Sequence, residues 1–247
     1  MSRIGRRYGG VLGRMTGTLL QRISRTGSLR VASDELELNG HGSCAGLAER
    51  LLRDVDRGHV IVPFWSRDQL TIALLAAERH GLRRALSRFE IVADDSIGGE
   101  IMWRVGEKFG LQMRRIHARG NPSRLEDLAE WLRHPTPFFI AVDGGSVYGT
   151  VPTGIVRMAA RLGSTVWPMA VHPRRRVRVP GIIADIPLPG TNLGVGVSRP
   201  LRVARAASIA EVTADVKQRL ERASRLARAY DAPADDSGAA TLREPHA

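Results

Sequence analysis

The run Phe138-Phe139-Ile140-Ala141-Val142-Asp143-Gly144 decides the fold class of this chain. Five consecutive apolar residues followed by an acidic residue and a glycine are typical of a buried strand that ends in a turn. Stretches with helical spacing of apolar residues flank the run at 124–133 and 154–162, and another apolar run follows at 165–171. This order of strand, helix and strand predicts a parallel β-α-β unit.

The same alternation extends toward the N-terminus. Further strands are predicted at 60–65, 89–93 and 113–116, and further helices at 68–80 and 97–109. We therefore expect an α/β fold with a mostly parallel central sheet flanked by helices.

After Val171 the pattern changes, because prolines and glycines divide the chain into short extended pieces at 177–186 and 193–198. These pieces predict antiparallel strands added near the C-terminal end of the sheet. Ser208 and Glu211 have the spacing of a capping box, which predicts a helix from there to about Tyr230.

The expected domain organisation has three parts. Residues 1–40 form a basic amphipathic segment, residues 41–230 form a single α/β domain, and residues 231–247 form a disordered tail with no apolar periodicity.

The N-terminal 33 residues contain seven arginines and no acidic residue. Their apolar residues recur at helical spacing: Ile4, Tyr8, Val11, Leu12, Met15, Leu19, Leu20 and Ile23. This pattern predicts a helix that lies in the headgroup layer of an anionic membrane. The alternative is a helix that packs on the core and leaves its arginines in solvent. Five glycines oppose helix formation, which favours a helix that forms on the membrane surface; they are Gly5, Gly9, Gly10, Gly13 and Gly17.

Composition narrows the classes of function. A formal net charge of +12 predicts an anionic partner, and a single cysteine, Cys44, excludes an internal disulfide. No apolar run has the roughly 20 residues of a spanning helix. No histidine pair has metal-ligand spacing, and the dinucleotide, P-loop and serine-hydrolase motifs are missing, so we expect no metal and no cofactor. The basic cluster at 172–178 is the best support for a nucleic-acid partner, which we consider unlikely because no reading module accompanies it.

Polar residues follow four of the predicted strands, at 65–68, 94–96, 114–120 and 143–145. Parallel strands bring their carboxyl ends to one edge of the sheet, where open α/β folds bind ligands. The four junctions therefore predict one cleft with arginines on one side and carboxylates on the other. A plainer alternative is that Asp95 or Ser96 caps the next helix and that Asp143-Gly144 is only a turn.

The order of motifs along 60–203 resembles a known family. The run at 138–144 is followed by the helix opening Thr153-Gly154-Ile155-Val156-Arg157-Met158-Ala159 and by Val166-Trp167-Pro168-Met169. Gly110-Leu111-Gln112-Met113-Arg114-Arg115 with Arg119-Gly120 comes before it, and Ile186-Pro187-Leu188-Pro189 and Ser198-Arg199-Pro200-Leu201 come after it. Together these are similar to the bacterial lysophospholipid acyltransferase-like proteins, in the branch classed as a domain of unknown function and related to the lipid A and glycerolipid acyltransferases.

The resemblance implies a glycerolipid acyltransferase-like fold and a membrane-peripheral protein that acts on or binds lysolipids. Two catalytic positions of the family are not retained, because Ser66 stands at the histidine position and Gly98 at the aspartate position. Asp68 and Asp95 are the substitute candidates for the base. The residues expected to contact substrate are Ser66, Arg67, Arg115, Arg119, Asp143, Gly144 and Gly145.

The expected partners are an acyl-CoA or acyl carrier protein as donor, a lysophospholipid or other lipid as acceptor, and an anionic membrane surface on the inner, cytoplasmic face of the cell membrane. The main alternative is a non-catalytic lipid-binding or scaffold protein that retains the pocket. A change of Ser66 to histidine alone is not expected to restore acyl transfer, because an imidazole without its orienting carboxylate is a poor base.

Overall fold

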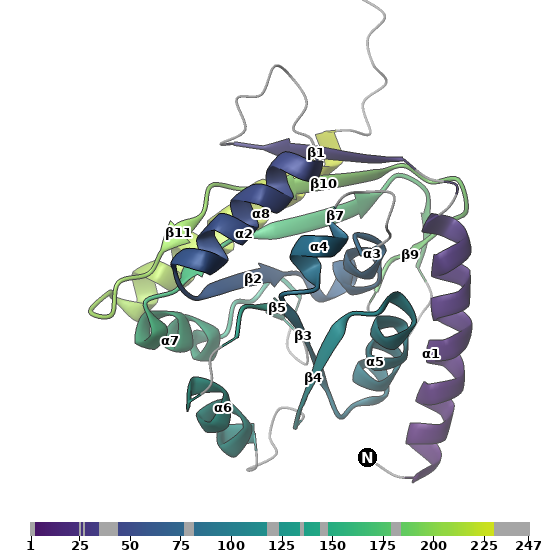
Figure 1. Cartoon of the computed structure of the whole chain (residues 1–247), viewed down its shortest axis with the longest axis horizontal. Coiled ribbons are helices and arrows are strands. Elements are labelled where there is room, and N and C mark those ends of the chain that lie inside the picture. Colours follow the sequence, from purple (N-terminus) through teal and green to yellow (C-terminus); the bar gives the residue numbers. More distant parts are fainter. Residues whose placement is uncertain are drawn as a thin grey trace, which may run out of the picture.

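A computed structural model describes residues 3–24, 26, 28–34, 44–76, 82–117, 124–133, 136–143, 148–178 and 184–229. The chain is an α/β protein in which helices cover mixed β-sheets (Figure 1). The expected α/β class is confirmed. The tail at 231–247 and the boundary at residue 40 lie outside the described residues.

A six-stranded sheet forms the centre of the molecule. Its strand order is β11 (Leu201–Arg202), β6 (Thr165–Val166), β2 (Val60–Phe64), β5 (Phe138–Ala141), β3 (Glu90–Asp94) and β4 (Gln112–Ile116). The five strands from β6 to β4 are parallel, and only the edge strand β11 runs antiparallel. The mostly parallel sheet agrees with the sequence analysis. The expectation that the pieces at 177–186 and 193–198 would add antiparallel strands to this sheet was wrong, because its antiparallel edge strand is β11 and residues 193–197 belong to another sheet.

Two smaller sheets complete the β structure. One has the order β1 (Leu29–Ser33), β10 (Leu193–Val197) and β7 (Met169–Pro173), and the other pairs β8 (Arg176–Val177) with β9 (Ile186–Pro187). The prediction of one strand over 165–171 was wrong, because the chain passes from β6 to β7 at Trp167 and Pro168 and so changes sheets. Pro168 has no amide hydrogen to donate to a ladder, which favours a break at this point.

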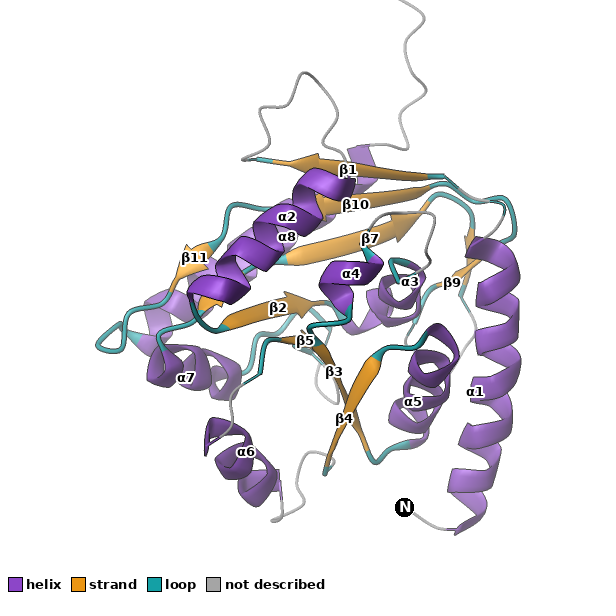
Figure 2. Cartoon of the chain, viewed as in Figure 1, coloured by secondary structure: helices purple, strands orange, loops and turns teal. Residues whose placement is uncertain are grey.

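All the predicted helices are present in the predicted order, one of them shortened. The helices are α1 (Arg3–Ser24), α2 (Cys44–Arg57), the short 3₁₀ helix η1 (Ser66–Asp68), α3 (Gln69–Leu74), α4 (Arg83–Leu86), α5 (Ile97–Phe109), α6 (Arg124–Arg133), α7 (Thr153–Leu162) and α8 (Ile209–Ala229). Of these, α2 and α4 were not predicted. Figure 2 shows them arranged around the strands. The helix predicted over 68–80 begins as a 3₁₀ turn, and its α-helical part ends at Leu74.

The core lies on both faces of the central sheet. All five residues of β2 are buried, and they alternate between two apolar clusters: Val60, Val62 and Phe64 belong to one, and Ile61 belongs to the other. This burial on both faces explains why β2 and β5 read as continuous apolar runs in the sequence.

Helix α1 lies along α5 at one side of the molecule (Figure 1). Leu20 and Ile23 of α1 are buried in the core, so the expectation that Ile23 would enter a membrane was wrong. Gly9, Gly13 and Gly17 face α5, and a Cβ at Gly13 would stand only 2.6 Å from the Cβ of Arg104. These glycines permit a close contact between α1 and α5. Packing on α5 therefore stabilises the α1 helix despite the poor helix propensity of glycine, and no membrane is needed for the helix to form.

Helix α8 packs on β10 and β7. The predicted N-cap is present, since the Ser208 hydroxyl accepts a hydrogen bond from the Glu211 amide at 3.5 Å. Beneath the C-terminal half of α8, a Cβ at Gly194 or Gly196 would fall within 2.1 or 1.9 Å of a helix carbonyl oxygen. The contact therefore requires glycine in β10 and fixes α8 beside the carboxyl ends of β2 and β5.

Candidate functional site

The neighbouring strands β2 and β5 end in polar residues that contact one another. The Ser66 amide donates a hydrogen bond to Oδ1 of Asp143 at 2.6 Å, and both residues are buried. The register of β2 on β5 pairs Phe64 with Ala141, so the residues that follow the two strands meet at one edge of the sheet. The structure thus brings Ser66 and Asp143 together, as the strand pattern predicted.

An arginine and two aromatic rings extend from these strand ends. The Arg67 guanidinium carbon lies 3.7 Å from the centre of the Tyr148 ring. The Tyr148 ring in turn lies 5.6 Å from that of Trp65, centre to centre. Gly149 has a φ of +84°, a backbone conformation that glycine adopts at no steric cost and that turns the chain directly after Tyr148. Stacking on Tyr148 holds the Arg67 side chain in place while leaving its N–H groups available to a ligand.

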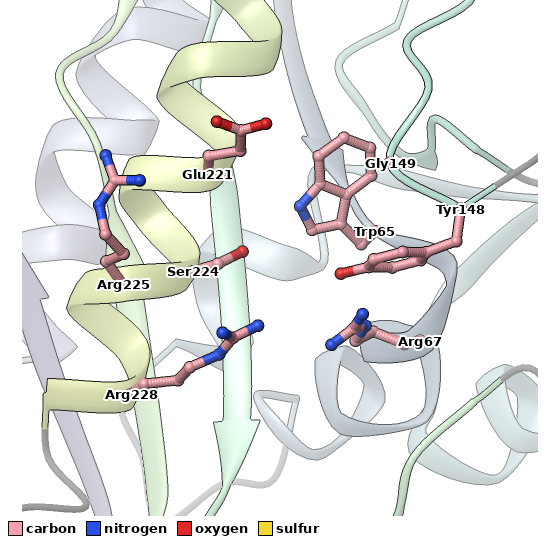
Figure 3. Close-up of a pocket in the computed structure, with 8 residues that line it drawn as sticks. All are labelled: Trp65, Arg67, Tyr148, Gly149, Glu221, Ser224, Arg225 and Arg228. Atoms are coloured by element: carbon pink, nitrogen blue, oxygen red, sulfur yellow. The ribbon is translucent and has the colours of Figure 1, made fainter.

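A pocket of about 270 Å³ opens between these residues and α8. Its walls are Trp65, Arg67, Tyr148 and Gly149 on one side and Glu221, Ser224, Arg225 and Arg228 on the other (Figure 3). Three arginines against one glutamate give the lining a net positive charge, and no ion pair joins these arginines to any of the described residues. Such a lining suits a phosphate or carboxylate group.

Buried carboxyl groups lie next to the pocket. Burial raises the pKa of Asp68 to about 8, and the nearby charges of Asp185 and Asp143 add to the increase, whereas Val171 and Arg67 oppose it. Burial also raises the pKa of the Tyr148 hydroxyl, with further contributions from Asp68 and Asp143. Asp68 is therefore largely protonated at neutral pH and does not cancel the charge of the arginines.

A second buried carboxylate is neutralised differently. Asp185 is 3% exposed, and its oxygens pair with Arg176 at 3.0 Å and Arg178 at 2.9 Å. These arginines come from the basic cluster that the sequence analysis considered for nucleic acid. Part of that cluster thus serves an internal ion pair.

The structure does not bring Arg115 to this pocket. Its guanidinium donates a hydrogen bond to Glu100 at 2.8 Å and stacks 4.6 Å from the centre of the Trp103 ring, so it lies against α5. Ion pairing with Arg104 and Arg115 accounts for the burial of Glu100. The expectation of a single cleft containing Arg115 and Ser66 was therefore wrong, because the Arg115 side chain points to the helix layer.

The junction after β3 is explained by helix capping. The Ser96 hydroxyl accepts a hydrogen bond from the Gly99 amide at 3.1 Å, and the Asp94 carboxylate accepts one from the Ser96 amide at 3.1 Å. Gly98, at the aspartate position of the resembled family, is exposed in the first turn of α5. Asp95 is half-buried and does not line the pocket. Arg119, Gly144 and Gly145 lie outside the described residues.

Sequence reasoning missed the contribution of α8 to the site. Arg225 and Arg228 have the i, i+3 spacing that also describes an ordinary solvated helix face. No local pattern shows that this face turns toward the end of β2, because the approach depends on Gly194 and Gly196 more than twenty residues earlier. Tyr148 was missed as well, because it belongs to no motif that marks a binding site.

A histidine and an aspartate meet at the end of β4. Nδ1 of His117 lies 2.9 Å from Oδ2 of Asp127, and the same oxygen accepts a hydrogen bond from the His117 amide at 2.6 Å. A spacing of ten residues does not match any motif in the sequence analysis. In the central sheet β5 and β3 lie between β2 and β4, and neither His117 nor Asp127 lines the pocket.

In comparisons with known proteins, neither a protein-family model nor a curated protein matches the chain. Among the described residues, no helix combines the length and apolar character needed to cross a membrane. The candidate site is therefore defined by its own geometry.

Proposed function

We propose that this protein is a lysophospholipid acyltransferase-like protein that binds the phosphate group of a lysolipid, or of a phosphate-bearing acyl donor, in the pocket between α8 and the ends of β2 and β5. The observation that carries the proposal is that Arg67, stacked on Tyr148, and Arg228 point toward each other across one pocket, whose lining also includes Arg225 (Figure 3). Arginine forks bind phosphate oxygens in pairs, and a tyrosine hydroxyl supplies a further donor.

The size of the pocket favours a headgroup over a whole lipid. A volume of about 270 Å³ lies just below the range of roughly 300 to 1,000 Å³ typical of sites that enclose a complete small ligand. A glycerol phosphate group fits such a space, and the acyl chain would then remain outside it. We place the protein on the inner, cytoplasmic face of the cell membrane, where lysolipids and cytoplasmic acyl donors meet.

Acyl transfer is the second candidate function, and Asp68 favours it. Transfer to a hydroxyl requires a group that can accept its proton, and Ser66 cannot do so alone. A carboxyl group with a pKa of about 8 is a strong enough base once it is ionised, and Asp68 lies one residue from Arg67. His117 pairs with Asp127 and does not line the pocket.

The binding experiment compares a soluble short-chain lysophosphatidate with the matching monoacylglycerol, which lacks the phosphate. We expect the lysophosphatidate to bind and the monoacylglycerol not to bind. Changing Arg225 and Arg228 together to glutamine should weaken binding at least about tenfold, since each lost charged hydrogen bond costs roughly 1.5 to 3 kcal/mol. The control changes Arg157 and Arg161 of α7, which are also exposed, to glutamine with the same loss of charge. Equal weakening in both variants would show that only net charge matters and would contradict the proposal.

The transfer experiment uses mass spectrometry to follow an acyl group from acyl-CoA or acyl carrier protein to a lysolipid. If Asp68 accepts the proton, Asp68→Asn abolishes transfer and leaves lysophosphatidate binding intact. Binding without any transfer by the unmodified protein would support the non-catalytic alternative.

A further inference from the structure

Helix α1 exposes an apolar stripe along most of its length. The stripe consists of Tyr8, Val11, Leu12, Met15 and Leu19, which are between 40% and 67% exposed. Their spacing is that of one helix face. Among the described residues, eight large apolar side chains are exposed, and these five all lie on α1. Such concentration on one element marks an interaction surface, whereas scattered exposed apolar residues are ordinary.

The stripe is held facing outward by the opposite side of the helix. Gly9, Gly13 and Gly17 lie so close to α5 that a Cβ on them would stand 2.9, 2.6 and 3.2 Å from its side chains. Leu20 and Ile23 continue that face into the core. Rotating α1 to bury the stripe would withdraw Leu20 and Ile23 from the core and bring larger side chains against α5. Within the part of the chain that the structure describes, the stripe therefore remains exposed.

The charge of α1 identifies what covers the stripe. The helix contains five arginines and no acidic residue, and Arg14 and Arg22 are exposed. Two copies of α1 packed face to face would bring their arginines together without a compensating carboxylate. An anionic bilayer offers both an apolar layer for the stripe and negative headgroups for the arginines.

We propose that α1 docks lengthwise on a bilayer of anionic lipid, with the stripe from Tyr8 to Leu19 inserted among the headgroups and Arg14 and Arg22 on lipid phosphates. This surface is separate from the pocket and acts whether or not the pocket binds a lysolipid. The structure refines the sequence expectation, because the helix is folded and packed before it meets a membrane and because Leu20 and Ile23 stay in the core.

The test is cosedimentation of the full-length protein with vesicles. Vesicles of phosphatidylglycerol and phosphatidylcholine are compared with vesicles of phosphatidylcholine alone, at low and high salt. The first variant changes Tyr8, Met15 and Leu19 together to serine. A single variant, Met15→Ser, is compared with Val177→Ser, which makes the same kind of change at an exposed apolar residue of β8. The second variant changes Arg14 and Arg22 to glutamine and is matched by the α7 variant at Arg157 and Arg161. Thermal unfolding verifies that each variant is folded.

We expect binding to the anionic vesicles that weakens at high salt. The triple serine variant should lose at least about 100-fold in partitioning, since partial burial of each side chain is worth about tenfold. The arginine variant should lose about 20-fold at low salt, and Val177→Ser should match the unmodified protein. Undiminished binding by the folded triple variant would overturn the proposal. The proposal would also be overturned if the unmodified protein formed dimers through α1 and did not bind vesicles.

Discussion

The two long helices at the ends of the fold, α1 and α8, approach their neighbours in the same way and present opposite outer surfaces. Each comes close because glycines remove side chains from the contact: Gly9, Gly13 and Gly17 in α1 itself, and Gly194 and Gly196 in the strand under α8. Among the described residues, α1 exposes five large apolar side chains and α8 exposes none.

Charged side chains on the outer face of α8 form ion pairs within the protein. Arg219 pairs with Asp215 at 2.6 Å, and Arg222 pairs with Asp34 at 2.9 Å. The arginines near its C-terminus line the pocket instead. The two helices therefore differ in what they present: α8 lines a pocket, and α1 exposes an apolar surface.

The largest expected effect comes from the contact beneath α8. A Cβ at Gly196 would lie 1.9 Å from the carbonyl oxygen of Ala223, which is backbone and cannot move without shifting the helix. We expect Gly196→Ala to lower the free energy of unfolding by about 3 kcal/mol or more. Urea unfolding measures this. The control, Gly154→Ala, has no atom within 4 Å of its new Cβ and should be neutral or slightly stabilising. Unchanged stability of Gly196→Ala would show that the close contact is not required.

The buried carboxyl group of Asp68 makes stability depend on pH. Because the pKa of Asp68 is raised from 3.8 to about 8, the folded state holds this proton more tightly than the unfolded state. The free energy of unfolding should therefore fall as the pH rises from about 4 to about 8, with no further loss from this group above that range.

Asp68→Asn removes this titration. The variant should gain stability relative to the unmodified protein across that window and be more stable by roughly 2 to 5 kcal/mol at pH 9. Thermal or urea unfolding at several pH values measures the difference. Asp56→Asn, at an exposed carboxylate, provides the control and should show no such trend. A constant difference between Asp68→Asn and the unmodified protein at all pH values would contradict the raised pKa.

The smallest effect concerns α1, whose glycines differ in what surrounds them. A Cβ at Gly13 would stand 2.6 Å from the Arg104 Cβ, whereas one at Gly10 would meet nothing closer than 3.9 Å. Gly13→Ala should therefore destabilise the protein by about 1 to 2 kcal/mol, and Gly10→Ala should be neutral or stabilising because alanine favours the helix. Calorimetric unfolding of the two variants measures the difference in their stabilities. Similar stabilities would show that α1 is not held against α5 by its glycines.

The sequence alone predicted those features that depend on local pattern. Buried strands such as β2 and β5 appear as apolar runs, Ser208 marks the start of α8, and Ser66 and Asp143 meet because their strands are parallel neighbours. Features that depend on distant contacts were missed. The side chain of Arg115 is directed by Glu100 on another element, and the arginines of α8 reach the pocket only through its packing on β10.

A structure of the protein with a short-chain lysophosphatidate bound tests the central claim most directly. We expect the phosphate in the pocket of Trp65, Arg67 and Tyr148, within hydrogen-bond distance of the guanidinium groups of Arg67 and Arg228, with the acyl chain leading out of the pocket. A lysophosphatidate bound elsewhere, with this pocket unoccupied at saturating ligand, would contradict the account.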